Sequence, residues 1–229
     1  MEKTFVRSLF DSIAHRYDLL NHLLSGGIDF YWRKRAIRHL SDVRPQRILD
    51  VACGTADFSI AALSLNPQTV VGVDISESML ALGRKKVSRN GFQKSIVLET
   101  GEAENLRFES ESFDAAIVAF GVRNFENLDK GLSEMCRTLR PLGRIVVLEF
   151  SRPRQFPVRQ LYLFYFKRIL PLIGKMVSGN ANAYAYLHDT VMQFPEGKNF
   201  LSRLEAAGFS QLREERLTFG IATVYSGTR

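Results

Sequence analysis

The fold is decided by the stretch Arg47-Ile48-Leu49-Asp50-Val51-Ala52-Cys53-Gly54-Thr55-Ala56-Asp57-Phe58-Ser59. It begins as an apolar, partly β-branched strand, breaks at small residues, and resumes as a helix through residues 60–63. Small side chains let the backbone approach a ligand closely, and the first N–H groups of a helix point outward without intrahelical partners. The stretch therefore predicts a nucleotide cradle at the end of a strand.

A second apolar strand, residues 69–73, ends at Asp74. A carboxylate about 20 residues after the first turn can accept hydrogen bonds from both hydroxyls of a ribose. Two alternatives stay open: a small-residue turn that serves packing alone, and an aspartate that only caps a helix. An NAD-dependent oxidoreductase is a further reading, but its fingerprint needs three glycines at fixed spacing, and only Gly54 is present.

The composition predicts one soluble domain. The chain has 229 residues, of which 45% are hydrophobic and 24% charged, and this is ordinary for a globular α/β protein. Two cysteines, Cys53 and Cys136, are too few to staple such a fold and indicate reduced thiols in the cytoplasm. We see no signal peptide and no apolar run of membrane-spanning length, so we expect at most membrane adherence.

The charge predicts an anionic partner. The net charge is +7, which favours either nucleic acid or a lipid surface. Nucleic acid is not expected, because there is no long Lys/Arg tract, no zinc spacing and no aromatic RNA-recognition motif. The histidines lack metal-ligand spacing, so no metal is expected. Residues 156–177 mix apolar, aromatic and cationic side chains, and predict either a core-facing helix or a lid that rests on anionic lipid.

The order of the elements predicts an α/β fold with helices on both faces of a mostly parallel sheet. Strands are expected at residues 46–52, 69–74, 95–100, 113–119, 144–150, 210–217 and 220–227, the last two forming an antiparallel edge. We divide the single domain (1–229) into a helical cap (1–44), a cofactor-binding core (45–152), a helical lid inserted after strand five (153–195), and a C-terminal helix with edge strands (196–229). Ligands of such sheets lie at the carboxyl ends of the strands.

Several motifs resemble the C-methyltransferases of menaquinone and ubiquinone biosynthesis. They are Leu49 to Asp57, Val73 to Leu80, Phe120-Gly121-Val122-Arg123-Asn124, Leu148-Glu149-Phe150-Ser151, Tyr184-Ala185-Tyr186-Leu187 and Phe194-Pro195. The first motif alone marks only a class I methyltransferase; the blocks at 120–124 and 148–151 are more specific. The resemblance extends from about residue 5 to 227.

The resemblance implies a Rossmann-like, seven-stranded class I methyltransferase fold with S-adenosyl-L-methionine as methyl donor. It also implies a polyprenylated quinol as acceptor, with demethylmenaquinol favoured and a ubiquinone-pathway benzoquinol as the alternative. A methyltransferase for another small molecule and a non-catalytic cofactor-binding protein also stay open. The oligomeric state, including a homodimer, is not determined.

Cofactor-binding residues follow from the same resemblance. Family members contact the cofactor at the positions of Thr55, Asp74 and the pair Glu102-Ala103, with Asp74 on the ribose and the loop after strand three beside the adenine. Asp50 and Gly54 complete the cradle. Ala119 stands where some relatives have serine, so only a backbone contact is expected there. Ala52 and Ala56 replace glycines found in many methyltransferases, and they keep a close approach plausible if their backbone has negative φ.

Catalysis of this kind asks the protein to position and polarise the acceptor. Methylation of a quinol ring carbon requires the neighbouring hydroxyl to lose a proton, while the cofactor supplies the electrophile. We expect Arg123 and Asn124 to meet the quinol oxygen, with the arginine stabilising a phenolate rather than acting as a base. The alternative for Arg123 is a structural ion pair. Tyr17 and Tyr184 are weaker candidates, and Glu149 is either a substrate ligand or a helix cap.

Overall fold

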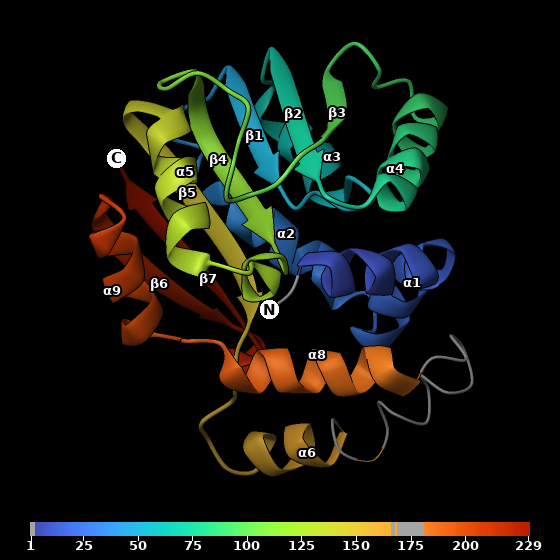
Figure 1. Cartoon of the computed structure of the whole chain (residues 1–229). Helices are drawn as coiled ribbons and strands as arrows, with labels where there is room; N and C mark the ends of the chain where they lie inside the picture. Colours follow the sequence, from blue (N-terminus) through green and yellow to red (C-terminus); the bar gives the residue numbers. More distant parts are fainter. Residues whose placement is uncertain (1–2, 166–167, 169–180) are drawn as a thin grey trace.

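A seven-stranded sheet in the order β3-β2-β1-β4-β5-β7-β6 forms the centre of the molecule (Figure 1). The computed structural model describes residues 3–165, 168 and 181–229, without the side chains of 16–24, 181–185 and 187. The strands are β1 (Arg47–Val51), β2 (Thr69–Asp74), β3 (Ile96–Thr100), β4 (Phe113–Ala119), β5 (Leu139–Phe150), β6 (Ser210–Leu217) and β7 (Ala222–Thr228). Strands β1 to β5 are parallel, and β7 is antiparallel to both β5 and β6. The predicted sheet is confirmed.

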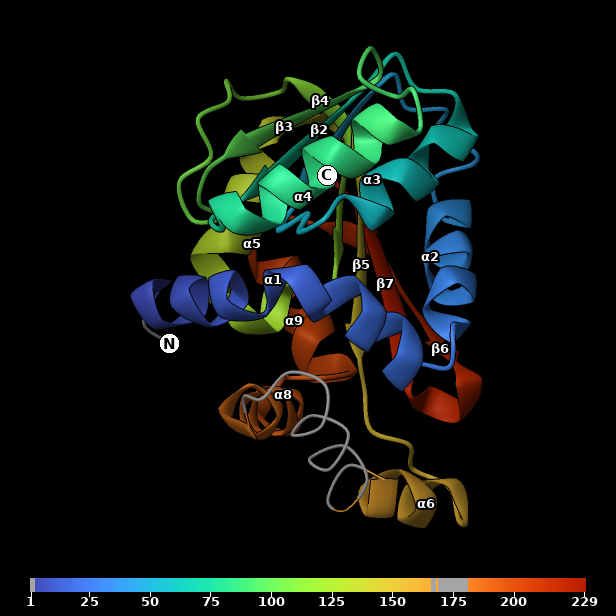
Figure 2. The same cartoon turned by 90° about the vertical axis from the view of Figure 1, so that its right-hand side faces the viewer.

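Helices cover both faces of this sheet (Figure 2). One face carries α2 (Ile28–Arg38), α3 (Asp57–Ala62) with the short helix η1 (Leu63–Leu65), and α4 (Glu77–Arg89). The other face carries α5 (Leu128–Thr138) and α9 (Lys198–Ala206). The central strands are buried from both sides, which explains why their sequences are continuous apolar runs rather than alternating ones.

Three more helices lie along the carboxyl edge of the sheet (Figure 1). They are α1 (Lys3–Leu24), α6 (Val158–Phe164) and α8 (Ala181–Gln193). Helix α1 belongs to the predicted cap, and α6 and α8 to the predicted lid. Within the described residues, no helix is long and apolar enough to cross a membrane, and no cluster of metal-ligating side chains occurs.

Strand β5 begins earlier than the sequence predicts. Its first residue is Leu139 rather than 144, and the pairing with β4 shifts between Phe113 and Ala115. Residues 141–143 therefore form an irregularity within one strand, with Leu142 in the left-handed region at φ 65°. The Leu142 N–H donates to the carbonyl of Arg229 at 3.1 Å, which compensates for the interrupted ladder.

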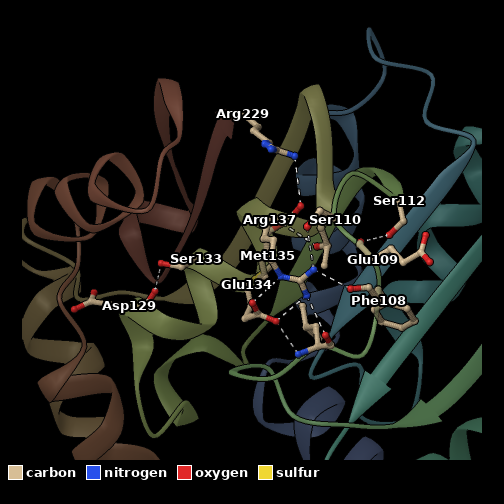
Figure 3. A network of polar contacts seen from close by, with 12 residues as sticks. Phe108, Glu109, Ser110, Ser112, Asp129, Ser133, Glu134, Met135, Arg137 and Arg229 are labelled. Atoms are coloured by element: carbon tan, nitrogen blue, oxygen red, sulfur yellow. Dashed lines mark hydrogen bonds and ion pairs between the residues drawn. The ribbon is translucent and has the colours of Figure 1, made fainter.

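The loop between β3 and β4 is fixed to α5 by Arg137 (Figure 3). Its guanidinium donates from Nη1 to the Phe108 carbonyl (2.8 Å) and from Nη2 to the Leu106 carbonyl (3.0 Å). Glu134 accepts from Arg137 Nε (2.8 Å) and from the Leu106 N–H (3.0 Å). Because this loop begins with residues 101–103, the Arg137 network holds one wall of the carboxyl edge in place.

Candidate active site

The turn after β1 is strained. Ala52, Gly54 and Ala56 all have left-handed backbones, with φ of 54°, 54° and 70°. The expectation of negative φ at the two alanines is therefore wrong. The chain reverses within a few residues between β1 and α3, and it does so with this left-handed backbone. This conformation costs an alanine roughly 1–2 kcal/mol, and strain of this kind is typical of ligand sites that the surrounding structure holds in place.

A cavity opens beside this turn at the carboxyl ends of β1, β2 and β4. Its volume is about 690 Å³ including the open mouth, within the usual range for small-molecule sites. Strand order reverses between β1 and β4, so the cavity lies at the point where ligands of open α/β sheets bind. The predicted site residues that line it are Gly54, Asp74, Ala103, Ala119 and Asn124.

Asp74 lies on the wall of this cavity. Its carboxylate accepts hydrogen bonds from the backbone N–H groups of Gly54 (2.8 Å) and Ser76 (2.9 Å). Burial raises the pKa of Asp74, the two backbone donors oppose that rise, and the nearby Asp11 carboxylate adds to it. Each oxygen keeps a lone pair for a further donor, so the side chain can still accept a ribose hydroxyl.

Helix α1 covers the mouth of the cavity, and sequence reasoning missed its contribution. Lys3 forms ion pairs with Glu102 (2.8 Å) and Glu104 (3.4 Å), residues of the loop after β3. Asp11 accepts a hydrogen bond from the Ser76 hydroxyl at 2.5 Å. Glu102 therefore lies at the rim of the cavity with Lys3. It does not line the cavity, whereas Ala103, predicted with it as a cofactor-binding residue, does.

A smaller cavity of about 360 Å³ adjoins the first and shares Ala52, Gly54, Ala119 and Phe120 with it. Asp50 and Thr55 line this second space. Asp50 is fully buried and accepts from the Ser59 hydroxyl at 2.5 Å. Burial raises the pKa of Asp50 to about 7, against the effect of the Ser59 hydrogen bond.

Arg33 and Cys53 also line the smaller cavity. Arg33 is buried and paired with Asp29 of the same helix. The sequence shows only a run of cations in helix 30–40 and does not indicate which one faces inward. Burial raises the pKa of the Cys53 thiol, which favours the neutral form over a nucleophilic thiolate.

Arg123 is held in a buried ion pair. It lies in the short helix η2 (Val122–Asn124) after β4, and its Nη1 donates to Glu149 Oε1 (2.5 Å) and to the Phe120 carbonyl (2.6 Å). The Arg123 side chain is 6% exposed and that of Glu149 is 0% exposed. Burial raises the pKa of Glu149, and the Arg123 charge opposes the rise. The ion pair considered as an alternative role for Arg123 is thus present.

Helix α8 meets the candidate site at Asn124. The Tyr186 hydroxyl of α8 donates to Asn124 Oδ1 at 2.9 Å, and burial raises the pKa of Tyr186, so this hydroxyl stays protonated. The backbone of Tyr17 belongs to α1 and that of Tyr184 to α8, but both side chains lie outside the described residues.

Comparison with known proteins identifies the family. The model of the ubiE/COQ5 methyltransferase family matches residues 1–229. The chain belongs to this family. It is 47% identical over 225 residues to the demethylmenaquinone methyltransferase of Bacteroides fragilis, covering 98% of this chain and 92% of that one. It is 43% identical over 226 residues to the ubiquinone/menaquinone biosynthesis C-methyltransferase UbiE of Geobacter sulfurreducens, covering 98% and 88%.

Solved structures of methyltransferases share the fold. One is an S-adenosylmethionine-dependent methyltransferase from Thermotoga maritima, a possible histamine N-methyltransferase, with TM-score 0.66, 18% identity, and coverage of 96% of this chain and 98% of that one. Another is phosphoethanolamine N-methyltransferase 2 of Haemonchus contortus in complex with S-adenosyl-L-methionine, with TM-score 0.59, 16% identity, and coverage of 80% and 48%. These structures confirm the predicted class I methyltransferase fold, and the family match with its relatives confirms the predicted family, enzyme class and methyl donor.

The residues of this ubiE/COQ5-family site fit S-adenosyl-L-methionine. The cofactor is cationic at sulfur, and the carboxylates of Asp50 and Asp74 approach its two connected cavities. Asp50 Oδ1 is buried and has no hydrogen-bond partner among the described residues. Gly54 has a left-handed φ and its N–H donates to Asp74, so the backbone of the turn and the predicted ribose ligand are already joined.

Proposed function

We propose that this chain methylates a ring carbon of demethylmenaquinol to give menaquinol. The observation that carries the proposal is 47% identity over nearly the whole chain to demethylmenaquinone methyltransferase of Bacteroides fragilis. A relative of the same name from Deinococcus radiodurans is 44% identical over 225 residues. The benzoquinol of the ubiquinone pathway is the second candidate acceptor, because the relatives named UbiE carry both pathways in their names.

The cofactor-binding residues divide by cavity. When bound, S-adenosyl-L-methionine supplies an electrophilic methyl group on a cationic sulfur. Asp74 accepts from the ribose hydroxyls, and Ala103 with its neighbour Glu102 flanks the adenine. Gly54, Thr55 and Ala119 approach through backbone or short side chains; Gly54 and Ala119 line both cavities, and Thr55 lines the smaller one.

Arg123 and Asn124 act on the acceptor. Arginine stays protonated, and Glu149 fixes the guanidinium from one side through Nη1. Its Nε is buried and has no hydrogen-bond partner among the described residues. We assign this donor, together with the Asn124 amide, to the developing quinolate oxygen, where a preorganised charge lowers the barrier. Tyr17, on the covering helix, stays a proposed lining residue.

The acceptor is tested with labelled S-adenosyl-L-methionine. We expect methyl transfer to demethylmenaquinol, and faster transfer to it than to a demethylated ubiquinol precursor. Label in neither quinol contradicts the proposal, and preferential label in the benzoquinol replaces it with the second candidate.

The role of Arg123 is tested with Arg123→Lys, which keeps a positive charge but loses the Nε donor. We expect kcat/KM to fall about 10²- to 10³-fold with cofactor affinity unchanged in calorimetry. Arg140→Lys is the matched control, because Arg140 pairs with Asp114 (2.5 Å) on the surface. Turnover near wild type in Arg123→Lys would leave Arg123 a purely structural residue.

We further propose that α6 rests on the cytoplasmic surface of an anionic membrane. Phe156, Leu161 and Phe164 are 80%, 65% and 59% exposed, whereas Tyr162 faces inward and is 7% exposed. Exposed Arg154, Arg159 and Arg168 accompany them. This pattern suits an interface between water and lipid, where a polyprenyl chain would enter. Residues 166–167 and 169–180 of the predicted lid lie outside the described residues.

Sedimentation with anionic vesicles tests the membrane contact. We expect Leu161→Ser combined with Arg159→Glu to weaken binding, while Arg140→Glu, on the distant surface, leaves it unchanged. Equal binding of the α6 variant and the wild type would remove this surface as the contact. The homodimer remains a prediction, which the mass of the protein in solution would decide.

A further inference from the structure

Two buried, oppositely charged side chains face the smaller cavity, each with a polar atom that lacks a hydrogen-bond partner among the described residues. They are Arg33, with Nε, and Asp50, with Oδ1. Arg33 is 7% exposed and Asp50 is 0% exposed. Buried polar atoms in native proteins are nearly always satisfied, so a pair of such atoms around one cavity indicates a ligand that completes them.

Each of these groups is held from behind. Asp29, itself 2% exposed, pairs with Arg33 Nη1 and accepts a hydrogen bond from the Ser25 hydroxyl at 2.7 Å. The guanidinium lies over the Phe120 ring, 5.7 Å from its centroid. Asp50 Oδ2 is taken by the Ser59 hydroxyl. The remaining atoms, Arg33 Nε and Asp50 Oδ1, are therefore oriented before a ligand arrives.

The spacing of charges matches a zwitterion. A planar guanidinium with free N–H groups binds a carboxylate, and a carboxylate oxygen accepts from an ammonium. A neutral quinol offers neither charge, and a quinolate would be repelled by Asp50. The amino-acid end of S-adenosyl-L-methionine carries an α-ammonium and an α-carboxylate on one carbon.

The connection between the cavities sets the direction of the cofactor. Asp74 and Ala103 line the larger cavity, where the ribose and adenine are assigned, and the smaller cavity continues from it past Gly54 and Ala119. We infer that Arg33 binds the α-carboxylate of S-adenosyl-L-methionine and that Asp50 accepts a hydrogen bond from its α-ammonium. Arg33 is thereby a cofactor-binding residue on α2, outside the sheet and its loops.

Calorimetry with two ligands that differ by one group tests this inference. Decarboxylated S-adenosylmethionine lacks only the α-carboxylate. We expect the wild type to bind S-adenosyl-L-methionine about 10- to 100-fold more tightly than the decarboxylated form, the usual range for a charge-assisted hydrogen bond. In Arg33→Gln this ratio should fall to about one.

Arg35→Gln is the matched control. Arg35 lies on the same helix but pairs with Glu215, away from both cavities, so its variant should keep the wild-type ratio. The ratio compares two ligands on one protein, so a loss of stability in Arg33→Gln does not alter its meaning. If that variant does not fold, the wild-type ratio alone decides. An unchanged ratio in Arg33→Gln, or no discrimination by the wild type, overturns the assignment.

Discussion

Replacing Asp50 with asparagine should change how the stability of the protein depends on pH. Burial raises the pKa of Asp50 from 3.8 to about 7. A carboxyl whose pKa is higher in the folded state than in the unfolded state stays protonated on the folded protein between those two values. The folded state then binds more protons, so the free energy of unfolding falls as pH rises from about 4 to about 7 and is level above that window.

The size of the effect follows from the two pKa values. One pKa unit corresponds to about 1.4 kcal/mol, so ionisation of the buried Asp50 carboxyl costs the folded state up to about 4 kcal/mol across the window. Asp50→Asn cannot ionise and loses this contribution. Asp74 and Glu149 also have raised pKa values, so the variant should be flatter than the wild type rather than fully level.

Urea unfolding at a series of pH values between about 5 and 8 measures this difference. Asp42→Asn is the control, because the hydrogen bond from Arg144 lowers the pKa of Asp42. A lowered pKa contributes stability above the unfolded value and loses it only in stronger acid, so this variant should have the wild-type slope. Parallel curves for wild type and Asp50→Asn would refute the reasoning about Asp50.

Three further changes test other parts of the structure. Ala52→Gly relieves about 1–2 kcal/mol of left-handed strain and loses about 0.4–1 kcal/mol through the unfolded chain. Thermal unfolding should therefore show a net gain of about 0 to 1.6 kcal/mol in the free energy of unfolding, and a clear loss contradicts the strain. Glu149→Gln leaves the Arg123 charge buried without its ion-pair partner and should lower the free energy of unfolding by about 3–5 kcal/mol, measured by urea unfolding. Adding Arg123→Met should restore part of this stability. If it does not, the unpaired charge is not the cause of the loss. Arg137→Gln removes the hydrogen bond to the Leu106 carbonyl, and we expect it to weaken cofactor binding several-fold in calorimetry. Unchanged affinity would mean that the loop after β3 does not contribute to binding the adenine.

The parts that sequence predicted well depend on local patterns. The apolar runs of β1, β2 and β4 follow from burial on both faces, and the sequence predicts Asp74 as a ligand because it ends such a run. The backbone of Ala52 could not be predicted from side-chain size, since the close packing of the β4 loop on the turn determines it: a Cβ on Gly121 would lie 2.7 Å from the Ala52 Cβ. The turn therefore adopts positive φ at Ala52 and Ala56 although neither residue is a glycine.

The parts that sequence missed depend on distant partners. Lys3 and Glu102, which form an ion pair, are 99 residues apart in the sequence. The sequence of α2 does not distinguish its cations, but in the fold Arg33 lines the same cavity as Asp50, whereas Arg35 pairs with Glu215. The sequence does not indicate the role of Glu149, because its partner Arg123 comes from another strand end. Pairings of this kind arise from the sheet order, which the local pattern does not contain.

Aspartate carboxylates line the two adjoining cavities of this protein. The chain as a whole is basic, with a net charge of +7, yet the two adjoining cavities bring Asp50 and Asp74 close enough that the Asp74 charge adds to the cost of ionising Asp50. A cationic ligand between them lowers that cost, since it supplies the opposite charge that burial has removed. Methyl transfer removes the positive charge from the sulfur, so part of this attraction is lost in the product. Asp50 and Asp74 thus place negative charge inside a basic protein, beside the cations Arg33 and Lys3 that also line these cavities, while the exposed Arg154, Arg159 and Arg168 lie outside both linings.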